Sequence, residues 1–153
     1  MPNSHNLQRF LSAQGDNIDT VLRELSDGKK LTHWMWYIFP QIQGLGRSAT
    51  AELYAIQSKD EAIAYLYHPV LGPRLVQCTK TVNGHAHLTA EQIFGYTDTL
   101  KFRSCMTLFE KVASNKTPFT EALKKFYRGE PDARTLLILD EFTTHRGHIV
   151  SPE

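Results

Sequence analysis

Residues 30–48 of the chain read KLTHWMWYIFPQIQGLGRS, and the rest of the sequence is organised around them. This stretch holds both tryptophans of the chain, Trp34 and Trp36, beside two further aromatic residues. The run 34–39 fits either a buried strand or a fully buried helix, because hydrophobic periodicity does not separate the two over so short a run. Since the flanking segments carry helical patterns, we expect a short helix. Pro40 should end it, because the residue before a proline resists the α conformation.

Helical spacing of apolar residues predicts one long helix before this stretch and another after it. Asp16 and Asp98 are placed to cap these two helices, and Gly28 supplies the stop of the first. Each helix carries one buried stripe at i, i+3, i+4, i+7 spacing. The stripes consist of Ile18, Val21, Leu22 and Leu25 in the first helix, and of Phe102, Cys105, Met106, Phe109, Val112 and Ala113 in the second.

Shorter helices are predicted from their capping residues and proline positions. Pro73, inside segment 70–76, implies either a kink or a helix that begins at that proline. No segment shows the alternation of a strand. About six or seven helices then predict an all-α fold, a compact single-domain bundle. The residues that open the shorter helices are Ser48, Ser58 with Glu61, Thr89 with Gln92, Pro118 and Asp132.

Length and composition fit one globular domain. At 153 residues, with 41% hydrophobic and 22% charged residues, the chain is long enough to bury a core without disulfides or metals. No linker, repeat or low-complexity segment divides it, so we expect residues 1–153 to form a single domain. From Thr143 onward no apolar stripe continues, and we expect this tail to fray.

Charge and apolar runs exclude several classes of partner. The 17 basic and 16 acidic residues leave a net charge of +1, which gives no bulk field to attract long nucleic acid or an anionic membrane. No run approaches the ~20 apolar residues of a membrane span, and the N-terminus lacks a signal pattern, so we expect a cytoplasmic protein. Cys78 and Cys105 lie within apolar helical patterns and are interpreted as reduced core thiols.

The loop from Gly44 to Ser48 is a candidate anion site. It joins flexible backbone to a helix start, where unpaired amide hydrogens and the helix dipole favour negative charge. Arg47 could grip a phosphate or carboxylate through two hydrogen bonds, and Ser48 adds a hydroxyl. Alternatively, Gly44 and Gly46 only permit a tight turn and Ser48 is a plain helix cap. The pattern matches neither a dinucleotide fingerprint nor a phosphate-binding loop.

The aromatic residues cannot all face the same way, so some of them belong to the core. Trp36 could stack on a planar ligand, or the tryptophans could simply fill the interior. His33 has an unperturbed pKa suited to proton transfer near neutrality, although a histidine beside tryptophans is more often a packed residue. Gln41 could orient a ligand by hydrogen bonds.

Three further polar residues lie outside this stretch. Lys101 and Ser104 are three apart on the later long helix, away from its apolar stripe, where they form either a solvated edge or a cation directed toward a pocket. Arg74 follows Gly72 and Pro73. If Arg47, Arg74 and Lys101 converge, the site would favour an anionic ligand.

Metal and hydrolase chemistry find little support in the sequence. His85 with His87, and His145 with His148, lack companion ligands at a known metal spacing, so we expect no metal site. No nucleophile elbow of a serine hydrolase occurs. No motif implies a cofactor.

Several segments resemble the bacterial family called domain of unknown function 1810. The resemblance extends from about Phe10 to about Thr135 and implies a compact, mainly α-helical single domain. It implies no particular activity, because the family has no established reaction. The label calpastatin sometimes attached to such proteins does not fit, since a calpain inhibitor of that kind is disordered and this chain has a core. The segments are 33–41, 44–48, 65–75, 93–95 and 101–109.

These observations lead to two hypotheses of different classes. In the first, the chain binds an anionic small molecule that contains a phosphate or a nucleotide, and the sequence leaves open whether it also catalyses a reaction. In the second, it is an interaction module that docks a peptide or a second copy of itself through its aromatic segment. The residues assigned to the first hypothesis are His33 as acid or base, Trp36 for stacking, Gln41 for orientation, and Gly44, Gly46, Arg47, Ser48, Arg74, Lys101 and Ser104 for binding.

Overall fold

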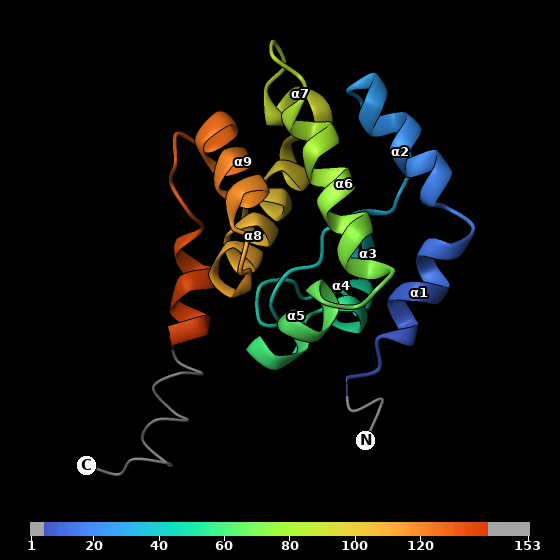
Figure 1. Ribbon diagram of the computed structural model, residues 1–153, viewed down its shortest axis with the longest axis vertical. Helices are drawn as coiled ribbons and strands as arrows, with labels where there is room; N and C mark the ends of the chain where they lie inside the picture. Colours follow the sequence, from blue (N-terminus) through green and yellow to red (C-terminus); the bar gives the residue numbers. More distant parts are fainter. Residues whose placement is uncertain (1–4, 141–153) are drawn as a thin grey trace.

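The computed structural model describes residues 5–140, and almost all of its regular structure is helical (Figure 1). The predicted tail from Thr143 and the predicted helical residue Phe142 lie outside these residues. A further helical segment at 133–140 follows the nine helices. The helices are α1 (Gln8–Gly15), α2 (Ile18–Asp27), α3 (Met35–Ile38), α4 (Ala49–Tyr54), α5 (Lys59–Leu66), α6 (Leu71–Asn83), α7 (Ala90–Phe94), α8 (Tyr96–Val112) and α9 (Thr117–Tyr127).

The all-α prediction is confirmed, but the expected number of six or seven helices is wrong. Residues 5–140 hold ten helical segments. Only the total was too low, because even the shortest helices, α3, α4 and α7 with 4, 6 and 5 residues, lie where the aromatic run and the caps Ser48 and Thr89 predicted them. Between residues 5 and 140 the only β pairing is an isolated parallel bridge between Ile42 and Ile56.

One hydrophobic core joins the helices. α8 packs against α9, α7 and α5, while α6 lies across α9, α5 and α2 (Figure 1). α3 connects α1 to α4. The Phe102 ring of α8 is fully buried, with its centre 4.9 Å from the Phe39 ring and 4.7 Å from the Phe94 ring. Aromatic contacts at these separations stabilise a core beyond simple burial.

The central aromatic stretch is mainly part of this core. It forms the one-turn helix α3, which ends before Pro40 as predicted, because Phe39 already has non-helical dihedral angles. Trp34 and Phe39 are 1% and 0% exposed, whereas Trp36 is half-buried. Of the two tryptophans, Trp36 is therefore the one that could contact a ligand.

Two predicted caps are wrong. α2 begins after Asn17 rather than Asp16, and α8 begins at Tyr96 after Gly95, two residues before Asp98. Gly95 has φ of 87°, a left-handed conformation that favours glycine, so the backbone turns into α8 without a side-chain cap. Asp98 is therefore free to form ion pairs in the first turn of α8.

A close approach of two helices fixes the position of α6. A Cβ atom on Gly72 would lie 1.9 Å from the Leu66 carbonyl oxygen at the end of α5, so only glycine fits there. α6 begins at Leu71, and Pro73 lies in its first turn, where the missing N–H costs no helical hydrogen bond. This junction sets one end of a groove between α5, α6 and α9.

Candidate functional site

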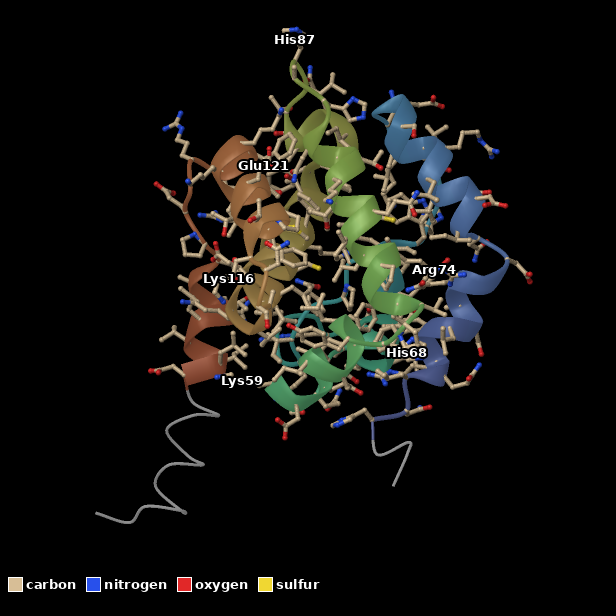
Figure 2. The ribbon with its side chains drawn as sticks, viewed as in Figure 1. Lys59, His68, Arg74, His87, Lys116 and Glu121 are labelled. Carbon is tan, nitrogen blue, oxygen red and sulfur yellow. The ribbon has the colours of Figure 1, made fainter. Side chains whose placement is uncertain are left out.

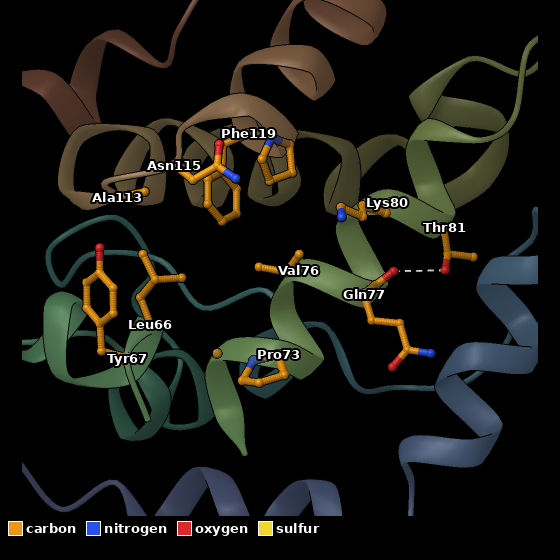
Figure 3. Close-up of a pocket in the computed structure, with 12 residues that line it drawn as sticks. Leu66, Tyr67, Pro73, Val76, Gln77, Lys80, Thr81, Ala113, Asn115 and Phe119 are labelled. Atoms are coloured by element: carbon orange, nitrogen blue, oxygen red, sulfur yellow. Dashed lines mark hydrogen bonds between the residues drawn. The ribbon is translucent and has the colours of Figure 1, made fainter. Parts of the chain in front are cut away.

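A groove of about 680 Å³ runs between the α5–α6 junction and the start of α9 (Figure 3). Its walls are mainly apolar: Val76 and Pro73 come from α6, Leu66 from α5, and Phe119 from α9. Ligand sites in proteins typically enclose about 300–1,000 Å³ and combine apolar walls with a few polar groups. The groove has the size and the lining of such a site.

The polar groups that line this groove include one cation, Lys80, and the amide of Asn115, beside Gln77, Thr81 and Tyr67. Lys80 of α6 is exposed, and its ammonium group has no hydrogen bond or ion pair with another described residue. Asn115 accepts a hydrogen bond from the Thr117 amide at 3.1 Å through Oδ1, so its Nδ2 can donate to a ligand. None of the described residues that line the groove is Asp or Glu. The groove therefore presents uncompensated positive charge beside an apolar surface.

Tyr67 forms the end of the groove near α5. Its hydroxyl donates to Ser114 Oγ at 2.8 Å and accepts from the Ser114 amide at 2.9 Å. These hydrogen bonds with Ser114 lower the pKa of Tyr67 below its ordinary value. Tyr67 thus links the end of α5 to the turn after α8.

The predicted site at the aromatic stretch is almost closed. Trp36, Gln41 and Gly46 line one common hollow, together with residues of α4. The hollow measures about 10 Å³, roughly the space of one water molecule. The structure thus brings these predicted residues together without an open cavity between them.

Lys101 lies beside this hollow and belongs to a small charge network. Its Nζ is 5.1 Å from the centre of the Trp36 ring and 3.2 Å from Asp98 Oδ1. Lys30 Nζ is 2.9 Å from the other oxygen of the same carboxylate and 5.2 Å from the centre of the Trp34 ring. Two ammonium groups share the Asp98 carboxylate, so the Lys101 ammonium next to Trp36 is only partly paired.

The loop after Pro40 lies at the surface. Gly44 has φ of 99°, and its carbonyl accepts a hydrogen bond from Arg134 Nη2 at 3.3 Å. Arg47 is exposed and has no hydrogen bond or ion pair within residues 5–140. Ser48 caps α4 by accepting from the Ala51 amide at 3.1 Å, as the simpler interpretation predicted. Their role in binding an anion stays a prediction.

Arg74, Ser104 and His33 have separate environments. Arg74 Nη1 donates to Gln14 Oε1 of α1 at 3.3 Å, beside α1 in Figure 2, and shares no partner with Lys101. Ser104 is buried and donates to the Leu100 carbonyl of its own helix at 3.1 Å. His33 is exposed and has no hydrogen bond with another described residue. Their assigned roles stay predictions as well.

The sequence missed the groove residues and Arg134. No local motif marks the groove residues Val76, Lys80 and Asn115. They come from α6 and from the turn between α8 and α9, which meet only in the folded chain. Arg134 approaches Gly44 from 90 residues away in the sequence.

Between residues 5 and 140, no group of three His, Cys, Asp or Glu side chains is placed to hold a metal ion. In the same part of the chain, every helix is too short or too polar to cross a membrane.

The fold and the groove define an all-α protein with a small-molecule-sized groove beside an aromatic core. Residues 4–139 match the family described as Protein of unknown function (DUF1810), and the chain belongs to this family. The crystal structure of the conserved hypothetical protein Rv1873 from Mycobacterium tuberculosis is similar, with 44% sequence identity and a TM-score of 0.89. The match covers 90% of this chain and 99% of that chain. No curated protein matches the chain.

Proposed function

We propose that this chain binds a small amphipathic anion in the groove between α5, α6 and α9. The apolar body of the ligand lies against Val76 and Phe119, and its anionic group meets the ammonium of Lys80. This proposal retains the anionic small molecule that the sequence suggested but gives it a different place in the fold.

The volume of the groove is the observation that supports the proposal. At about 680 Å³ it can take a ligand of some ten to twenty heavy atoms, whereas the hollow beside Trp36, at about 10 Å³, cannot. Each methylene group that leaves water contributes about 0.8 kcal/mol, so the apolar walls supply most of the affinity. Lys80 then selects the charge of the ligand, because no described lining residue neutralises it.

The competing hypothesis of an interaction module has less surface to act through. Trp34, Tyr37 and Phe39 are at most 9% exposed, so α3 offers a partner little more than Trp36. Interface anchors are typically aromatic side chains that a partner can enclose. We therefore favour a small ligand in the groove over a peptide docked on the aromatic segment.

Isothermal calorimetry with decanoate, decanol and decyltrimethylammonium tests the proposal. Decanoate should bind wild type most tightly, because only its carboxylate pairs with Lys80. Lys80→Gln should weaken decanoate binding about twofold to fivefold, as the loss of one exposed ion pair implies, and leave decanol unchanged. Lys124→Gln, an exposed lysine of α9 outside the groove, is the matched control and should change nothing.

A second variant fills the groove. Val76→Trp should abolish binding of both decanoate and decanol, because the indole occupies their place, while the far-ultraviolet circular dichroism stays that of wild type. Equal binding of decanoate to wild type and Val76→Trp would exclude the groove as the site. No binding of any of the three probes to wild type would refute an amphipathic ligand.

A further inference from the structure

We infer that residues 44–52 form a lid over Trp36, and that lifting this lid opens a second site, for a planar aromatic anion. This site is separate from the groove and does not depend on it. The nearly closed hollow at Trp36 is then the closed state of the lid rather than a feature of a solid core.

Hydrogen bonds fix both ends of the lid to the rest of the fold. At its start, the Gln43 amide donates to the Ile56 carbonyl, and the Ile56 amide donates to the Gln41 carbonyl, each at 2.8 Å. At its end, Arg9 Nε of α1 donates to the Leu53 carbonyl at 2.8 Å. A segment whose ends are held close together while its middle lies on the surface has the form of an Ω-loop.

The middle of the lid is weakly packed. None of the α4 residues is buried, and the lid contains two glycines, of which Gly44 has a left-handed φ of 99°. Leu45 is the one large apolar side chain of the lid, and it is partly buried against the core. Arg134 Nη2 holds the Gly44 carbonyl at 3.3 Å through an exposed hydrogen bond. Segments with few buried apolar contacts open at a lower free energy than the whole molecule unfolds.

The groups beneath the lid suit an aromatic anion. Gly46 and Ala51 of the lid line the hollow together with Trp36 and Gln41. Lys101 Nζ lies 5.1 Å from the centre of the Trp36 ring. Lys101 and Lys30 share the carboxylate of Asp98, so the Lys101 ammonium beside the Trp36 indole is only partly paired. When the lid lifts, a planar ring takes its place against the indole, Gln41 donates a hydrogen bond, and the anionic group pairs with Lys101.

Arg47 explains why the lid would close again over the ligand. It is exposed, lies on the lid itself, and has no ion pair within residues 5–140. A bound anion gives it a partner, so the closed lid is stabilised by a charge-assisted hydrogen bond absent from the free protein. Ligand binding and lid closure are therefore coupled through Arg47.

Hydrogen exchange on the full chain tests the lid. The amides of Ala51 and Glu52, both hydrogen-bonded to Ser48, should exchange faster than the amides in the middle of α6 and α8. Arg134→Ala should speed their exchange about twofold to tenfold, which is the effect of losing one charge-assisted hydrogen bond. Arg23→Ala, an exposed arginine of α2, should not. Exchange as slow as that of α6, or no response to Arg134→Ala, would overturn the lid.

Nuclear magnetic resonance with 2-naphthalenesulfonate tests the site, with 2-naphthol as the neutral control. The sulfonate should shift the Trp36 indole and Ala51 amide signals, leave the buried Trp34 indole unchanged, and slow exchange at Glu52. Lys101→Gln should weaken this binding about twofold to fivefold, whereas Lys80→Gln in the groove should not. Shifts confined to groove residues, equal binding of naphthol, or no binding to wild type would each overturn the second site.

Discussion

At the scale of single residues, Glu24 shows how one buried charge organises the approach to α3. Its carboxylate accepts hydrogen bonds from the Trp34 indole at 2.8 Å, from the Leu31 amide at 2.8 Å, and from the amide and hydroxyl of Thr32 at 3.2 and 2.8 Å. The residue is 5% exposed. Burial alone would raise its pKa, but the hydrogen bonds outweigh it and hold the pKa of Glu24 below its ordinary value of 4.5.

Glu24→Gln should therefore destabilise the protein in a pH-dependent way. At pH 7 we expect the free energy of unfolding to fall by about 1–3 kcal/mol, because a neutral amide cannot accept all of these hydrogen bonds. The folded pKa lies below the unfolded one, so the stabilisation by the carboxylate is complete above the unfolded pKa and is lost as the pH falls through the folded pKa. Urea unfolding at pH 7, 5 and 3 measures this. A wild-type advantage that stays constant down to pH 3 would contradict the assignment.

The sequence did not reveal this arrangement. It indicated that some tryptophans belong to the core, but it could not say which, because a stretch of six residues has no clear period. In the structure Trp34 is the buried tryptophan, and its indole donates a hydrogen bond to Glu24, which lies ten residues earlier on α2. Buried hydrogen bonds between separate elements depend on the tertiary fold and leave no local pattern.

At the scale of elements, Arg9 joins α1 to the end of α4 and to α5. Nη2 donates to the Ala55 carbonyl at 2.8 Å, and the guanidinium binds both carboxylate oxygens of Glu61 at 3.0 and 3.1 Å. The two side chains are 11% and 3% exposed, so this ion pair is shielded from water. A planar guanidinium can make such divergent contacts, but a lysine ammonium cannot.

Arg9→Lys should thus destabilise the protein although it conserves the charge. We expect a loss of about 2–4 kcal/mol in the free energy of unfolding, since several buried acceptors lose their donor. Urea unfolding followed by circular dichroism gives this value. Arg23→Lys on the exposed face of α2 serves as the matched control. If both variants were equally stable, Arg9 would be only a surface residue.

The contact between α5 and α6 makes a second prediction at this scale. Gly72→Ala should cost about 3 kcal/mol or more, because the new Cβ would overlap the Leu66 carbonyl oxygen and force the helices apart. Gly15→Ala is the control: at Gly15 in α1 a Cβ would meet nothing within 4 Å. Thermal unfolding of both variants measures the difference. A Gly72→Ala protein as stable as Gly15→Ala would show that the helix junction yields easily.

Helix ends were predictable where the capping chemistry is local. Thr89 and Gln92 form the expected capping box, and Asp132, predicted to open the last helix, accepts a hydrogen bond from the Thr135 amide. Asp98 failed as a cap because α8 already begins at Tyr96, after Gly95, so that its carboxylate lies inside the first turn and pairs with Lys30 and Lys101. The short helices α3, α4 and α7 were also located from the sequence, through Pro40, Ser48 and the Thr89–Gln92 capping box, although the expected total of six or seven helices was too low.

At the scale of the whole molecule, the core and the groove between α5, α6 and α9 differ in how much of each could be predicted from the sequence. Apolar stripes indicate which residues are buried, so the all-α fold class could be predicted from the spacing of apolar residues alone. The groove needs α6 and the α8–α9 turn to meet, and neither has a binding motif. Trp36, Gln41 and Gly46 line a common hollow because they are close in sequence, but the sequence did not show that this hollow is almost closed.

The two cysteines provide the test of cooperativity for this core. Cys78 and Cys105 are 1% and 0% exposed, and burial raises the pKa of Cys78 to about 12 and that of Cys105 well above its ordinary value. Both are packed in the cluster that joins α1 to α9. A cysteine thiolate attacks the disulfide bond of a labelling reagent and releases the reagent's thiolate, so both thiols should react only when the whole molecule unfolds. With 5,5′-dithiobis(2-nitrobenzoate) at pH 8, we expect labelling in water at least about a hundredfold slower than in 8 M urea.

The free energy of opening that these labelling rates give should equal the free energy of global unfolding from a urea titration. Prompt reaction of either thiol without urea would mean that α6 or α8 opens independently of the rest of the core.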